Sequence, residues 1–214
     1  MIDRVLTRMV AGAVLVAACA SHSAAQEQLE IGATVGYYSP MGSFQPVQLY
    51  STDLPRSPSS LSGTAFGGDL RLWFAPRVGL ELAGSTIASS VGGGSTPNGV
   101  RPSVPARVTE GTAELLFRVT GDATRTRVWI GAGTAAIWHG GVAYRDFENA
   151  MSLGSVIGLG SAFRIRGGLN ANIGVSTLIY ILDIHGSTLS DTAVEERGTQ
   201  SDMMLRTGVS YSWP

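Results

Sequence analysis

The chain has 214 residues, of which 14% are charged and 28 are glycine. Soluble domains usually carry about 25% charged residues, so this chain is poor in the side chains that keep a soluble surface hydrated. Its 15 basic residues, all of them arginine, face 16 acidic ones, which excludes the strongly basic surface of a nucleic-acid-binding protein. The length suits one domain, or one domain with a short appendage.

Residues 1–25 have the pattern of a secretory signal peptide. Arg4 and Arg8 provide a positive start, and residues 9–20 form an apolar run too short to span a bilayer. Small residues follow at the expected cleavage position. We therefore expect a signal peptide at 1–25 and a mature, exported domain at 26–214.

The single cysteine, Cys19, lies inside this leader. Residues 16–19 also resemble the lipobox of bacterial lipoproteins, in which the cysteine is acylated and becomes the new N-terminus. Under both interpretations, no disulfide forms within the chain.

Beyond the leader, eight segments alternate apolar and polar residues at period two, which predicts strands with two different faces. In the first segment, Leu29, Ile31 and Val35 share one face, whereas Glu30 and Thr34 share the other. The predicted strands cover 29–38, 64–74, 77–87, 107–119, 127–138, 153–164, 169–182 and 203–213.

The connections between these segments alternate in length. Three are short and carry turn signals at Pro76, Gly121 and Gly167. The other four are long and cover 39–63, 88–106, 139–152 and 183–199. This alternation is typical of bacterial outer-membrane barrels. We predict an all-β fold, an eight-stranded antiparallel transmembrane β-barrel (an up-and-down meander) with short periplasmic turns and long extracellular loops.

The distribution of charge decides which face of the strands meets lipid. A soluble barrel wets its outer face with charge, yet these strands carry few charges, and those gather on one face beside many glycines. We infer that the apolar face meets lipid in a bacterial outer membrane, where every backbone amide needs a partner within a closed sheet. The small and charged residues then fill a narrow eight-stranded interior.

Ten aromatic residues lie near strand ends, where amphipathic rings favour the two membrane–water interfaces. They predict two aromatic belts, made of Tyr37, Tyr38, Trp73, Phe74, Phe117, Trp129, Trp138, Phe163, Tyr211 and Trp213.

The predicted interior holds both signs of charge. Buried ions must be paired, because an unpaired one costs several kcal/mol. We therefore expect an ion-pair network that fills the barrel, with a narrow pore for small solutes as the alternative. The network consists of Glu30, Asp69, Arg71, Glu81, Glu110, Glu114, Arg118, Arg127, Arg164 and Arg206. No metal-ligand spacing or cofactor motif is present, so we expect neither a metal nor a cofactor.

The mature chain resembles the small outer-membrane barrels of the OmpA and OmpX type, through its eight alternating segments and the ending 209–213, Val-Ser-Tyr-Ser-Trp. Proteins of that family serve as membrane anchors, adhesins or host-interaction proteins. The resemblance implies a structural or adhesin-like role without enzymatic activity. It also implies contact with membrane lipid and lipopolysaccharide, insertion by the barrel assembly machinery, and extracellular protein or surface ligands bound through the loops.

A second resemblance, to the lipid A deacylases, rests on His185 and Ser187. That family uses a histidine and a serine two residues apart, which lie on one face of a strand. His185 is then the general base for Ser187, oriented by Glu195 or Glu196. Thr188 stands where that family typically has asparagine, and this departure makes the hydrolase the alternative hypothesis.

Overall fold

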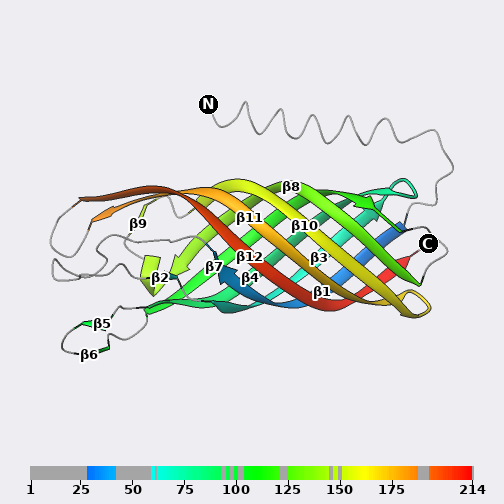
Figure 1. The fold of residues 1–214 in the computed structure, drawn as a ribbon, viewed down its shortest axis with the longest axis horizontal. Coiled ribbons are helices and arrows are strands. Elements are labelled where there is room, and N and C mark those ends of the chain that lie inside the picture. The colour runs from blue at the N-terminus through cyan, green and yellow to red at the C-terminus, as the bar shows by residue number, and fades with distance from the viewer. Residues whose placement is uncertain are drawn as a thin grey trace, which may run out of the picture.

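Among the residues that the structure describes, eight long antiparallel strands close into one barrel in the computed structural model (Figure 1). The described residues are 28–41, 59–60, 62–92, 95–96, 99–100, 104–120, 125–144, 147–148, 151–187 and 193–213. The barrel strands are β1 (Gln28–Pro40), β3 (Gly63–Trp73), β4 (Val78–Gly92), β7 (Val104–Arg118), β8 (Thr126–Gly141), β10 (Met151–Arg166), β11 (Leu169–Ser187) and β12 (Ala193–Trp213). Short elements in the long connections are β2 (Ser59–Ser60), β5 (Ser95–Thr96), β6 (Gly99–Val100), the 3₁₀-helix η1 (Val142–Tyr144) and β9 (Phe147–Glu148).

Each barrel strand pairs with its neighbour along the chain, and pairing of β1 with β12 closes the sheet. This register runs from Leu29 opposite Trp213 to Pro40 opposite Asp202. Closure gives the backbone amides internal partners, which a membrane-spanning sheet requires. The fold class predicted from the sequence is confirmed, and each of the eight predicted segments coincides with one barrel strand.

The connection between β10 and β11 shows why one end of the barrel has tight turns. Only two glycines separate these strands, and Gly167 has a backbone φ of 57°. Glycine adopts this left-handed conformation without the steric penalty that a side chain brings. The sequence Gly167–Gly168 therefore turns the chain at once and fixes the register of the two strands.

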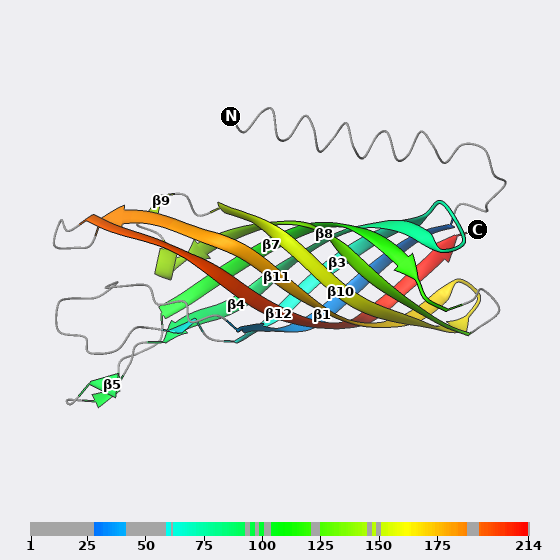
Figure 2. The same cartoon turned by 45° about the horizontal axis from the view of Figure 1, so that its top comes forward.

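Several strands run further toward the extracellular end than the alternation predicts. β11 and β12 remain paired up to Ser187 opposite Ala193, so much of the predicted loop at 183–199 is a β-hairpin. Figures 1 and 2 show this hairpin extending beyond the other barrel strands. Apolar alternation is needed only where a strand faces lipid. Backbone pairing therefore continues beyond the segment that the alternation marks.

The outer face of the barrel is an apolar band. Exposed apolar side chains come from every barrel strand, among them Ile31, Phe66, Leu82, Leu115, Ile130, Ile157, Ile173 and Leu205. A continuous apolar surface of this kind is stable against lipid and not against water. The band therefore crosses a membrane, with the apolar face outward as the alternation predicts.

Some sequence predictions concern residues outside the described part of the chain. The signal peptide at 1–25, with Cys19, lies there, as does most of the predicted loop at 39–63. Within the described residues, no helix is long and apolar enough to cross a membrane.

Candidate functional site

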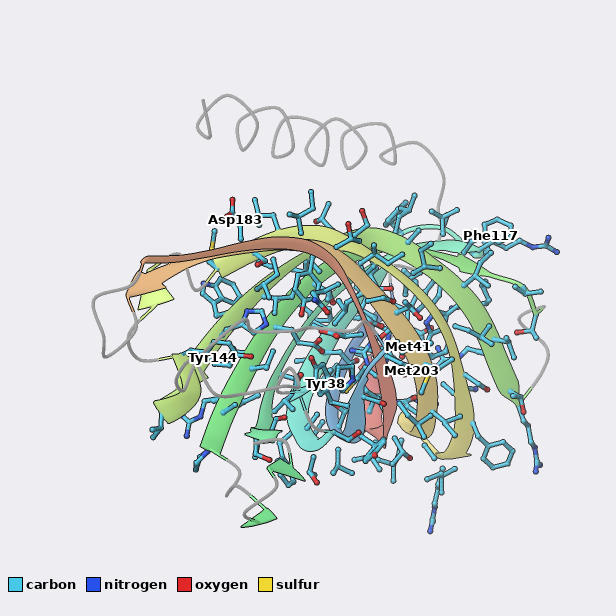
Figure 3. All side chains as sticks on the ribbon, turned by 60° about the vertical axis from the view of Figure 1, so that its left-hand side comes forward. Tyr38, Met41, Phe117, Tyr144, Asp183 and Met203 are labelled. Atoms are coloured by element: carbon cyan, nitrogen blue, oxygen red, sulfur yellow. The ribbon has the colours of Figure 1, made fainter. Side chains whose placement is uncertain are left out.

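The barrel interior contains two layers of different chemistry. Near the short turns, the buried side chains are mostly charged and polar, and toward the long connections they are mostly apolar. Figure 3 places Tyr38 and Tyr144 at the end with the long connections and Phe117 near the opposite end. Any ligand, ion or solute that uses the lumen must pass both layers, so they form the candidate functional site.

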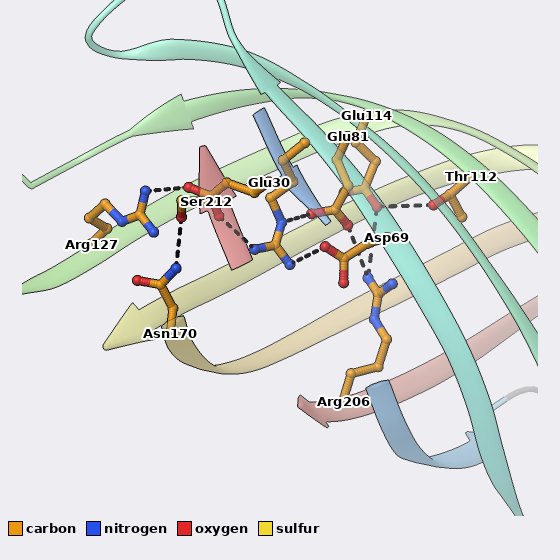
Figure 4. A network of polar contacts seen from close by, with 10 residues as sticks. Glu30, Asp69, Glu81, Thr112, Glu114, Arg127, Asn170, Arg206 and Ser212 are labelled. Carbon is orange, nitrogen blue, oxygen red and sulfur yellow. Dashed lines mark hydrogen bonds and ion pairs between the residues drawn. The ribbon is translucent and has the colours of Figure 1, made fainter. Parts of the chain in front are cut away.

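Arg71 of β3 is the centre of the polar layer, and Figure 4 shows its partners Glu30, Asp69 and Glu81. Its Nε lies 2.6 Å from Glu81 Oε2, one terminal nitrogen lies 2.9 Å from Asp69 Oδ2, and the other lies 3.5 Å from Glu30 Oε2. The four side chains come from three adjacent strands, β1, β3 and β4, and all are buried. One guanidinium group thus contacts three carboxylates through the several donors that its planar geometry provides.

Two further arginines extend this cluster across the barrel. Arg127 of β8 pairs with Glu30 and hydrogen-bonds Gln28 at 3.1 Å. Arg206 of β12 lies between Glu81 and Glu114, 3.8 Å and 3.9 Å from their carboxylates. The contacts cross from β1 and β12 to β4, β7 and β8, so ion pairs link strands on different sides of the lumen.

Two aromatic rings pack against arginines of the polar layer. Trp73 and Trp129 meet edge to face, with ring centroids 6.2 Å apart. Arg118 lies 4.2 Å above the Trp73 ring and Arg71 lies 4.7 Å above the Trp129 ring, both in cation–π geometry. Gly160 makes room for this stack, because a Cβ atom there would lie 2.5 Å from the Trp129 ring.

A small cavity of about 40 Å³ remains within the polar layer. Its lining includes Asp69, Arg71, Glu114 and Arg206, and also Asn172. A water molecule needs at least about 10–15 Å³ of such space and several polar partners. The cavity therefore suits a few waters that hydrate the ion pairs, and it is too small for a larger solute.

The extracellular half of the interior is an apolar layer that the sequence reasoning missed. Its fully buried side chains come from most of the barrel strands and include Ile87, Val108, Ile137, Val156, Leu178, Leu182 and Met204. The signal was present at 178–182, Leu-Ile-Tyr-Ile-Leu, which is apolar on both faces and so departs from strict alternation. This pattern is typical of a strand with apolar surroundings on both faces, here lipid outside and a packed layer inside.

A group of polar residues sits within the apolar layer. The hydroxyl groups of Tyr38 and Tyr180 both donate to Asp202 Oδ2, each at 2.7 Å. His139 lies 3.4 Å from the Tyr180 hydroxyl and packs against the Tyr144 ring, with centroids 5.2 Å apart. Burial, and then the Asp202 carboxylate, raise the pKa of the Tyr144 phenol in η1, so this ring stays protonated. The contacts hold η1 against the barrel mouth.

Three residues of the predicted aromatic belts do not lie at the lipid interface. Tyr38, Trp73 and Trp129 are only 2%, 3% and 6% exposed and face the lumen. The belt prediction was wrong for these rings because position near a strand end does not determine the face, whereas period-two alternation does. The exposed rings on the outer face are Tyr37, Phe117, Trp138, Phe163, Tyr211 and Trp213, while Phe74 is half-buried just past β3.

Three other predicted lumen residues lie apart from the central cluster. Arg164 is exposed at the short-turn end of β10, where a register irregularity between Arg164 and Arg166 precedes the turn. Glu110 is buried nearer the apolar layer and accepts a hydrogen bond from the Ser85 hydroxyl at 3.0 Å. Arg118 faces Trp73, as described above.

The alternative hydrolase residues lie on the extracellular hairpin. His185 and Ser187 belong to β11, and His185 is opposite Glu195 of β12 in the backbone register. Their side chains fall outside the described part of the structure. Among the described residues, no group of three or more His, Cys, Asp or Glu side chains is arranged to hold a metal ion.

No protein-family model and no curated protein sequence matches the chain, but solved structures match its fold. The outer membrane protein OprG from Pseudomonas aeruginosa has a TM-score of 0.65 at 16% identity, covering 87% of this chain and 95% of that chain. The outer membrane protein AlkL, solved in DMPC lipid bilayers, has a TM-score of 0.59 at 12% identity, covering 90% and 93%. The N-terminal β-barrel domain of Pseudomonas aeruginosa OprF has a TM-score of 0.50 at 12% identity, covering 88% and 100%.

These similarities are low in sequence identity and establish the fold alone. This chain has the fold of small bacterial outer-membrane barrels, as the sequence predicted. It also has the lipid-facing band that such a location requires.

Proposed function

We propose that this protein is a structural barrel of the bacterial outer membrane, with a filled interior and no enzymatic activity, that presents its extracellular segments to surface partners. The observation that supports the proposal is the presence of two successive layers of buried side chains in the lumen. Ion pairs around Arg71 occupy one half and buried apolar side chains occupy the other. A solute would have to break buried ion pairs and open a packed apolar layer to pass.

The extracellular hairpin supports the second part of the proposal. β11 pairs with β10 only up to Gly154 opposite Tyr180, but its pairing with β12 continues to Ser187. The paired backbone therefore projects beyond the barrel wall. This position suits contact with an extracellular protein or other surface ligand, and with lipopolysaccharide around the barrel.

The closed interior is tested by electrical recording of the purified protein in planar bilayers. We expect no discrete conductance steps from samples whose folded state is verified by a heat-dependent shift in gel mobility. Regular steps at constant voltage would contradict a filled lumen and favour the narrow-pore alternative.

The surface role is tested on bacterial cells that display a shortened hairpin. Replacing residues 186–194 with Asn-Gly between His185 and Glu195 keeps these two residues opposite each other and ends the hairpin in a tight turn. We expect the folded variant to reach the membrane at the wild-type level but to lose retention on immobilised serum proteins. Equal retention of both strains would contradict a surface role for the hairpin.

A further inference from the structure

Six arginines gather at the periplasmic end of four neighbouring strands, β4, β7, β8 and β10. We call this group the arginine crescent, and it consists of Arg77, Arg118, Arg125, Arg127, Arg164 and Arg166. Backbone hydrogen bonds connect its members across strands. The amide of Arg118 donates to the carbonyl of Arg77 at 2.8 Å, and the amide of Arg164 donates to the carbonyl of Arg125 at 3.0 Å.

The crescent carries a large positive charge on one side of the barrel mouth. Arg127 is neutralised by Glu30 and Arg118 packs on Trp73, but the other four arginines are exposed. The remaining barrel strands reach this mouth with neutral groups such as Gln28, Asn170 and Ser212. Among the described residues of this end, no carboxylate is exposed. The charge is therefore directed toward one sector rather than distributed around the rim.

The outer wall of the same sector is hollowed. A groove of about 630 Å³ lies on the lipid-facing side of β7, β8, β10 and β11. Cross-strand rows form its walls, with Phe117, Ile130 and Leu159 in one row of the register. The next row has the small side chain of Ala132 between Leu115 and Ile157, and this deepens the surface there.

We propose that the arginine crescent and this groove together bind an anionic phospholipid of the periplasmic leaflet, with its phosphate on the exposed arginines and an acyl chain in the groove. Guanidinium groups match phosphate oxygens in charge and in bidentate geometry. Arg164 lies five residues along β10 from Leu159, or about 16 Å at the usual strand rise, which an acyl chain spans. An anionic cell-wall polymer has the charge but no apolar tail for the groove.

Native mass spectrometry of the full-length protein in mild detergent tests this inference. Phosphatidylglycerol and phosphatidylcholine with identical acyl chains are added at equal concentration, and the retained lipid is counted. We expect the wild type to retain about tenfold more phosphatidylglycerol, because several surface charges each contribute modestly. The triple variant Arg125→Gln, Arg164→Gln, Arg166→Gln should lose this preference. The matched control is Arg107→Gln, since Arg107 is exposed at the opposite end of β7.

The groove is tested separately by Ala132→Phe, which fills the space between Leu115 and Ile157. We expect this variant to retain about tenfold less of both lipids while keeping the preference for phosphatidylglycerol. Heat-dependent gel mobility verifies that each variant is folded.

The inference is overturned by equal retention of the two lipids, by an unchanged preference in the triple variant, or by unchanged retention in Ala132→Phe. Displacement of phosphatidylglycerol by soluble peptidoglycan fragments would also overturn it, in favour of a wall polymer. The inference requires the membrane barrel but not a closed lumen, so conductance through the barrel would leave it intact.

Discussion

Replacing Arg71 with methionine tests the interior most directly. The substitution keeps the length of the side chain but removes the guanidinium group that contacts Glu30, Asp69 and Glu81. These three side chains are only 1%, 2% and 6% exposed, so they have little access to bulk water. Removing one partner of a buried ion pair typically costs about 3–5 kcal/mol of unfolding free energy.

The cost should fall near the lower end of that range, about 3 kcal/mol. Arg127 still pairs with Glu30 after the substitution, and Arg206 lies 3.8 Å from Glu81 and is able to move closer. In the part of the chain that the structure describes, Asp69 forms an ion pair with Arg71 alone, so it carries most of the penalty. Adding Asp69→Asn to Arg71→Met should therefore recover more than 1 kcal/mol of the loss.

The measurement is urea unfolding of the barrel in lipid vesicles, followed by gel mobility without heating. The control, Arg107→Met, replaces an exposed arginine and should change the unfolding free energy by less than about 0.5 kcal/mol. A loss below about 1 kcal/mol for Arg71→Met would refute the reasoning, because it would mean that the carboxylates are not held by this arginine.

Substituting Gly160 with valine should destabilise the barrel by about 1–3 kcal/mol in the same urea assay, because the new Cβ atom would lie 2.5 Å from the Trp129 ring. Wild-type stability would show that the stack is not packed as described. Ile157→Arg places a charge in the middle of the lipid-facing face of β10, where Ile157 is 61% exposed, and should cost about 2–4 kcal/mol in lipid vesicles. A neutral effect would mean that this face does not meet hydrocarbon. His185→Ala and Ser187→Ala should leave lipid A acylation, measured by mass spectrometry, the same as in cells with the wild-type protein. If the wild type removed an acyl chain from lipid A and the variants did not, the hydrolase hypothesis would be favoured.

The sequence predicted the barrel and its inner face because both depend on local alternation. Glu30 and Arg71 lie on adjacent strands, and each is placed inside by the parity of its own strand. Long-range information was not needed for that step. The same parity places Tyr38, Trp73 and Trp129 inside, and it was the use of strand-end position as a separate criterion that misplaced them.

The depth at which the interior changes from polar to apolar was not predictable in the same way. Tyr38 and Asp202 meet although 164 positions separate them in the chain, and Tyr180 joins them from a third strand. Whether these residues share one level depends on strand tilt and on the register across the closing pair of strands, which alternation within a strand does not encode. The partners of a buried charge in a barrel are therefore set by how the sheet closes. A substitution at one level of the interior tests the contacts made there by several strands at once.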